Sequence, residues 1–130
     1  MNGEKDLDTI LKTMQPQLNS GEFVFCTVAS IDAIATVDIL LFFKEAEGYT
    51  IIVRKEIADN FKLDYSFVAA WITLTVHSSL AAVGLTAAFS TALSANGISC
   101  NVVAAFYHDH IFVDTKDAAK AMTVLQQLSK

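Results

Sequence analysis

A long uncharged segment limits the folds available to this chain more than any other feature. Between Tyr65 and His108 the sequence contains no Asp, Glu, Lys or Arg. A membrane-spanning helix needs about 20 apolar residues in a row, and this segment never provides them. The residues that interrupt it are Thr73, Thr75, His77, Ser78, Ser79, Gly84, Thr86, Ser90, Thr91, Ser94, Asn96 and Gly97. We therefore predict that the segment is buried within protein and does not enter a membrane.

The charge of the chain argues against nucleic acid as a partner. The net charge is -5, and none of the nine basic residues lies between Lys62 and Lys116. Phosphate binding needs clustered Lys and Arg, because the release of counterions drives that association. The first residues, Met1 to Asp6, contain no apolar core followed by a small-residue cleavage site, so no secretion signal is predicted. We expect a cytoplasmic protein.

The size of the chain favours self-association. With 130 residues and 53% hydrophobic content it can bury one substantial core or two small ones. A half of about 65 residues hides only about 60% of the surface that its unfolded chain exposes, so each half would be marginal alone. A shared interface and a homodimer or higher homo-oligomer are expected.

The first half of the chain alternates between helix and strand patterns. Asp6 is placed to cap a helix with apolar residues at helical spacing, and Glu47–Gly48 is a tight-turn signal between two apolar runs. The predicted elements are a helix over 6–18, strands over 22–29, 36–45 and 49–53, and a short helix after Arg54.

The second half repeats the alternation with a longer central strand. Trp71, Thr73 and Thr75 share one face of that strand. Asn96–Gly97 is a helix stop, because glycine adopts the left-handed conformation without a Cβ clash. The predicted elements are a strand over 67–77, a helix from Leu85 to the Asn96–Gly97 stop, strands over 99–106 and 111–114 around a turn at 107–110, and a helix over 117–128.

Two segments of the chain share one plan. Residues 48–61 and 110–122 both read as a strand, a polar cap region and an amphipathic helix. This duplication predicts an α+β protein with two ferredoxin-like units in tandem, over 1–64 and 65–130, with antiparallel sheets. The first unit lacks an evident opening strand. Strand exchange between halves or between subunits is therefore left open.

The sequence resembles a family of small bacterial proteins with tandem ACT domains. The resemblance is strongest in HSSLAAVGLTAA, ISCNVV and YHDHIFV within residues 70–113, and it extends to LDTILKTMQPQLNSGEFVFCTV and EGYTIIVRKEIAD. A more remote similarity links the chain to the regulatory domains of aspartate kinases and to a mammalian cytosolic arginine sensor. The resemblance implies a βαββαβ fold in each half and side-by-side domains. It also implies an effector, such as an amino acid, at a domain or subunit interface.

The resemblance also implies where the effector binds. In the family, the turn after the opening strand and the start of the next helix contact the ligand; here these residues are His77, Ser78, Ser79, Leu80, Val83, Gly84, Leu85 and Thr86. The chemistry agrees, because amides at a helix start favour a carboxylate and glycine permits close approach. The ammonium of an amino acid needs acceptors, for which the Asn101 side chain, carbonyls of residues 101–103 or Asp109 of a neighbouring subunit are candidates.

Enzyme chemistry has less support in the sequence. His77, His108 and His110 with Asp109 suit a metal ion, but a polar hairpin tip is the better explanation of the last three, so no metal is predicted. His77 and Ser78 are adjacent and would face opposite sides of a strand, which does not suit a nucleophile and its base. Cys26 and Cys100 match no metal or redox spacing. No cofactor is predicted.

Three functions follow from these patterns. The first is a non-catalytic regulatory protein that binds a small effector. The second is a structural or protein-interaction module that kept the fold and lost the ligand. The third is a metal-dependent hydrolase that uses the histidines.

Overall fold

The computed structural model describes residues 6–75 and 84–129, and the chain packs into two compact units. One unit combines the chain up to Ser20 with the chain from Ala70 onward, and the other is formed by residues 21–69. The ends of the chain therefore belong to the same unit, which we call the terminal unit; residues 21–69 form the middle unit.

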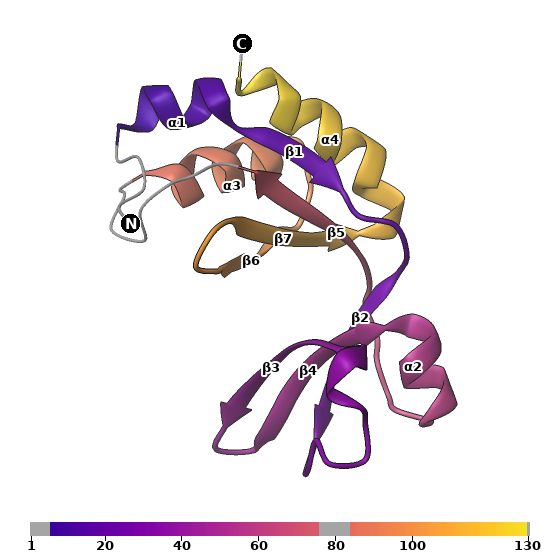
Figure 1. The fold of residues 1–130 in the computed structure, drawn as a ribbon. Coiled ribbons are helices and arrows are strands. Elements are labelled where there is room, and N and C mark those ends of the chain that lie inside the picture. The colour runs from indigo at the N-terminus through magenta and orange to yellow at the C-terminus, as the bar shows by residue number, and fades with distance from the viewer. Residues whose placement is uncertain (1–5, 76–83, 130) are drawn as a thin grey trace. The chain divides into compact units, whose positions relative to one another are not determined.

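The terminal unit is a sheet covered by helices on one face (Figure 1). Its strands run in the order β1-β5-β7-β6. Its elements are α1 (Leu7–Thr13), β1 (Gln15–Leu18), β5 (Val68–Thr75, from Ala70 on), α3 (Leu85–Ala95), β6 (Asn101–Ala104), β7 (Asp109–Asp114), η2 (Thr115–Asp117) and α4 (Ala118–Gln127). Strand, helix, two strands, helix and a final strand follow in ferredoxin-like order when β1 is taken as the final strand.

Strand β1 therefore comes from the start of the chain and completes the sheet of the second half. It pairs antiparallel with β5, with Gln15 opposite Thr75 and Leu18 opposite Ile72. The sequence left open whether the first half borrows a strand; in this structure the exchange runs the other way. The first half lends a strand here.

The predicted helix over 6–18 is wrong in its last third. Helix α1 ends at Thr13, and residues from Gln15 on form a strand. Pro16 explains the difference, because proline disfavours helical conformation at the residue before it and has no N–H for a helix interior. Strand β1 lies at the edge of the sheet, where proline is tolerated.

The core of the terminal unit joins both ends of the chain. Ile10 and Met14 of the first segment are 0% and 2% exposed and pack with Phe89 of α3 and Leu125 of α4. At the start of α1, the Asp6 carboxylate accepts a 2.7 Å hydrogen bond from the Thr9 hydroxyl. The first twenty residues are thus part of the hydrophobic core.

The middle unit has the strand order β3-β4-β2-β5, where only the first two residues of β5 belong to this unit. Its elements are β2 (Phe23–Val28), η1 (Thr36–Asp38), β3 (Ile39–Glu45), β4 (Gly48–Arg54) and α2 (Lys55–Asn60). The predicted hairpin at Glu47–Gly48 is confirmed, with Glu45 paired to Gly48. The predicted strand over 36–45 starts later, because residues 36–38 form a 3-10 turn.

The middle unit differs from the terminal unit after its opening strand. Residues 29–38, all of them described, contain only the short η1 where the terminal unit has the helix α3. Ile34 fills part of this space and is 5% exposed in a cluster with Val24, Cys26 and Ile51. The edge strand β3 keeps Phe42 and Phe43 exposed at 49% and 65%.

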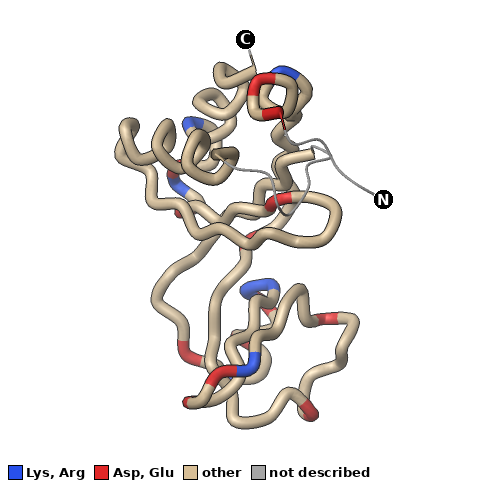
Figure 2. Tube along the Cα trace, turned by 90° about the vertical axis from the view of Figure 1, so that its left-hand side faces the viewer, with Lys and Arg blue, Asp and Glu red and all other residues tan. Residues whose placement is uncertain are grey.

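The charge-free segment of the sequence folds mainly into the terminal unit. Figure 2 marks the acidic and basic residues along the Cα trace; α3 contains none of them, and it buries Leu85, Phe89 and Leu93. The prediction that this segment is buried within protein is confirmed for these side chains. In the described part of the chain, no helix is long and apolar enough to cross a membrane.

Replacing Ile10 with Ala should destabilise the terminal unit, because it removes a fully buried side chain from the core that Ile10 shares with α3 and α4. We expect a loss of about 2–5 kcal/mol in the free energy of unfolding. Urea unfolding followed by the fluorescence of Trp71, the single tryptophan, measures it. Val37→Ala, at a side chain 91% exposed, is the control and should cost less than about 0.5 kcal/mol. Equal effects of the two changes would contradict the packing of α1.

Candidate functional site

The start of helix α3 is shaped by Gly84. This glycine is the N-cap residue, with φ 97° and ψ -14°, a left-handed conformation that a side chain disfavours. No side chain caps the helix at this residue, and the first turn carries no acidic residue. The first amides of a helix lack partners within it and carry partial positive charge. The helix start therefore offers donors to an anion.

One side of Gly84 is occupied by the first helix of the chain. A Cβ atom at residue 84 would lie 3.1 Å from Cδ2 of Leu7, which is closer than ordinary van der Waals contact. Leu7 thus packs over the Cα of Gly84. A ligand at the helix start has to approach the backbone from another side.

The other predicted site residues are distributed as follows. Leu85 is buried at 4% exposure and belongs to the core, whereas Thr86 is exposed and its carbonyl accepts a 2.6 Å hydrogen bond from Ser90. His77, Ser78, Ser79, Leu80 and Val83 lie outside the described residues. The structure therefore brings together Gly84, Leu85 and Thr86.

Asn101 lies on the face of the sheet that α3 does not cover. It opens strand β6, and its Nδ2 donates a 3.2 Å hydrogen bond to the carbonyl of Phe112. Its neighbour Val102 packs against the core that contains α3. Because successive side chains of a strand alternate between faces, Asn101 points away from that helix.

A polar and aromatic cluster lies on the same face of the sheet in the terminal unit, opposite α3. The indole Nε1 of Trp71 donates to Nδ1 of His110 at 3.0 Å. The Thr73 hydroxyl lies 3.2 Å from the same nitrogen and accepts a 3.0 Å hydrogen bond from Asn19 Nδ2. The Trp71 ring also stacks on Phe112, with centroids 6.4 Å apart. The cluster connects β5, β7 and the residue that follows β1.

This geometry fixes the state of the His110 ring. An indole N–H can only donate, so Nδ1 of His110 accepts and the ring is neutral with its proton on Nε2. Burial, and then the positive charge of His108, lower the pKa of His110 from 6.5. Burial raises the pKa of the neighbouring Asp109 carboxyl, and His108 lowers it by a smaller amount.

The predicted turn at 107–110 is wrong at its last two residues. Strand β7 begins at Asp109, and the turn is closed by the amide of Ala105, which donates to the carbonyl of His108 at 3.0 Å. His110 therefore lies on a strand and faces Trp71, a contact that the sequence analysis missed. The alternation of Trp71 and Thr73 was the available signal. Among the residues with described positions, no group of three His, Cys, Asp or Glu is arranged to hold a metal ion.

Comparisons with known proteins identify the relatives of the chain. Two family models, each described as an ACT domain, match residues 2–70 and 66–127. A Vibrio cholerae protein of unknown function has a similar structure, with a TM-score of 0.88, 42% identity, and coverage of 97% of this chain and 98% of that chain. No functionally curated protein matches the sequence.

More distant structures share the fold. An Agrobacterium tumefaciens protein matches with a TM-score of 0.66 and 18% identity, covering 89% of each chain. The regulatory subunit of aspartate kinase from Thermus thermophilus matches with a TM-score of 0.66 and 10% identity, covering 92% of this chain and 99% of that chain.

The state of His110 predicts how stability depends on pH. Its pKa in the folded chain lies below the ordinary 6.5, so the unfolded chain takes up the proton more readily. The free energy of unfolding should be fully retained above pH 6.5 and fall as the pH drops from there through the folded-state pKa. Urea titrations at several pH values measure this.

The variant His110→Gln should lose this part of the pH dependence. His108→Gln is the matched control and should keep most of it, because burial is the larger cause of the low pKa of His110. A native chain whose stability does not change between pH 7.5 and 5.5 would contradict the assignment.

Proposed function

Because the chain belongs to the ACT domain family, we propose that it is a regulatory protein that binds a small carboxylate, an amino acid first of all, at the start of helix α3. Family membership suggests a ligand-binding regulatory role. The class of ligand and its place are inferred from Gly84 and the first turn of α3.

The start of α3 at Gly84, where the N-cap residue has no side chain to bond the first amides, is the observation that carries the proposal. A carboxylate there would receive hydrogen bonds from backbone amides and would face the positive end of a helix of 11 residues. The family resemblance adds further contacts to the proposed site, from the hydroxyls of Ser78 and Ser79 and from His77, Leu80 and Val83. Asn101 is also proposed as a contact. It lies on the sheet face that α3 does not cover, so it would contact a different part of the ligand from the helix start or a different ligand.

The organisation of the chain is part of the proposal. We propose two sequence repeats, 1–64 and 65–130, of which the second supplies the binding helix start. The regulatory subunits of aspartate kinases share this fold. By analogy with them we propose a regulatory role for this chain and nothing more specific. No catalytic role and no cofactor are proposed, and the cytoplasm is the proposed location.

A homodimer is the proposed assembly state. Strand β3 is an edge strand, and its Phe42 and Phe43 are largely exposed. Unpaired strand edges with apolar side chains favour association with another strand or surface. These residues support self-association, which the small size of each unit also favours.

One observation favours the alternative function, an interaction module without a ligand. Leu7 occupies the space next to the Cα of Gly84, so part of the helix start is filled by the protein itself. A chain that dimerises tightly and responds to no effector would fit this alternative.

A panel of the standard amino acids should reveal the effector by thermal shift. We expect at least one of them to raise the melting temperature selectively and with increasing concentration. A ligand at 100 times its Kd stabilises the folded state by about 2.7 kcal/mol. The absence of any such response would favour the interaction module.

Two glycines at opposite ends of α3 provide a matched pair of variants. Gly84→Ala should abolish the ligand response, because the added Cβ meets Leu7 and disturbs the helix start. Gly97→Ala places the same change at another positive φ, 73°, where nothing lies within 4 Å. It should lower the basal melting temperature but keep the response. A response unchanged in Gly84→Ala would remove the helix start from the site.

A further inference from the structure

The middle unit contains an open hollow that is independent of the site at α3. Its volume is about 590 Å³, within the range of small-molecule sites in proteins. Strand β2, strand β4 and the loop that follows α2 line it. The residues that line it are Phe25, Cys26, Thr27, Thr50, Asp64, Tyr65 and Ser66.

The hollow exists because a strand ladder ends early. In the described chain, β2 pairs with β5 only at Phe23 with Ala69 and at Val24 with Val68. Beyond these two pairs, residues 64–66 and the β2 residues Phe25 and Thr27 line opposite sides of the hollow. If the ladder continued, hydrogen-bonded strands would fill this space. The backbone changes direction after α2, where Lys62 adopts a positive φ of 55°, and the loop that follows leads to residues 64–66.

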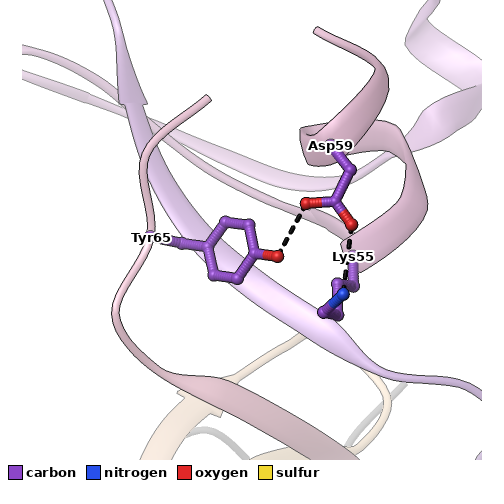
Figure 3. A network of polar contacts seen from close by, with 3 residues as sticks. All are labelled: Lys55, Asp59 and Tyr65. Carbon is purple, nitrogen blue, oxygen red and sulfur yellow. Dashed lines mark hydrogen bonds and ion pairs between the residues drawn. The ribbon is translucent and has the colours of Figure 1, made fainter. Parts of the chain in front are cut away.

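The wall formed by Tyr65 is held in place by helix α2 (Figure 3). The Tyr65 hydroxyl donates a 2.6 Å hydrogen bond to Oδ1 of Asp59, and Lys55 Nζ donates to Oδ2 at 3.1 Å. The bonds from Tyr65 and then Lys55 lower the pKa of the Asp59 carboxyl, so it remains an anion. Lys55 is bound to Asp59, and its Nζ lies 6.0 Å from the centroid of the Tyr65 ring, but Lys55 is not among the residues that line the hollow.

The lining selects for a positive charge. Asp64 is the charged side chain in it, and Phe25 and Tyr65 provide aromatic rings beside the hydroxyls of Thr27, Thr50 and Ser66. Aromatic faces and a carboxylate both attract a cation. The middle unit as a whole has eight acidic and four basic side chains, so its field also favours cations.

Cys26 does not add a second negative charge to the hollow. Cys26 is among the lining residues, and burial, followed by the negative charge of Asp64, raises the pKa of its thiol above 9.0. At neutral pH the thiol is therefore uncharged and adds to the apolar part of the lining.

We propose that this hollow binds a small molecule that carries a protonated amine or guanidinium on an apolar stem. Asp64 pairs with the charged group, and the rings of Phe25 and Tyr65 contact the stem. The site goes beyond the regulatory site at α3, because it lies in the other unit and prefers the opposite charge. It stands whether or not α3 binds a carboxylate.

A pair of probes of similar shape tests the sign of the charge. The protonated amine 2-phenylethylamine and the anion 3-phenylpropionate are titrated separately into the full ¹⁵N-labelled chain, and amide chemical shifts are recorded at pH 7. The amine should shift the resonances of residues 25–27, 50 and 64–66 in a saturable way. The anion should bind there at least about fivefold more weakly.

Two carboxylate variants locate the charge. Asp64→Asn should weaken amine binding at least about fivefold. Asp38→Asn is the control, because Asp38 is exposed and precedes β3 on the far side of β4 from β2; it should leave binding unchanged. Equal binding of both probes, an unchanged affinity in Asp64→Asn, or shifts that map to other residues would overturn the proposal. These outcomes leave the test of α3 unaffected.

Discussion

The pairing of β1 with β5 is the contact on which the terminal unit depends. It supplies the final strand of a ferredoxin-like sheet from the beginning of the chain, and it brings Ile10 and Met14 into the core. The same segment carries Leu7, which packs over Gly84. The closing strand of the sheet and one wall of the candidate site therefore come from a single stretch of about twenty residues. Its packing determines both the stability of the unit and the access to α3.

The two units have diverged from a common plan in ways that separate their chemistry. The terminal unit keeps a helix after its opening strand, and that helix start can receive an anion. In the middle unit residues 29–38 contain only a 3-10 turn at that point, so it has no corresponding helix start. Its hollow arises instead where the ladder between β2 and β5 ends, and the lining residue Asp64 gives it the opposite charge preference. The two proposed sites of the chain therefore differ in the charge of the ligand that each would take.

Local patterns predicted most of the fold. The hairpin at Glu47–Gly48 and the helix stop at Asn96–Gly97 were correct, because turns and caps depend on the conformations of a few adjacent residues. The predicted helix over 6–18 is wrong from Met14 on, because the backbone limits of Pro16 override the apolar periodicity there.

The candidate site was only partly predictable. The family resemblance named Gly84 and Thr86, and the structure places both at the start of α3. The position of Leu7 beside Gly84 could not be predicted, since it depends on a strand exchange between segments far apart in the sequence. The pairing of Trp71 with His110 was missed for a similar reason: the start of β7 had to be known before the faces of the two strands could be compared.

A disulfide across the exchanged strands tests the origin of β1 most directly. Gln15 and Thr75 are exposed and opposite each other, so the double variant Gln15→Cys, Thr75→Cys should form a bond under mild oxidation. The single variants control for Cys26 and Cys100. On a non-reducing gel the oxidised protein should migrate as a single chain whose mobility changes on reduction. A covalent dimer would show that β1 is exchanged between subunits, and the absence of any bond would contradict the pairing.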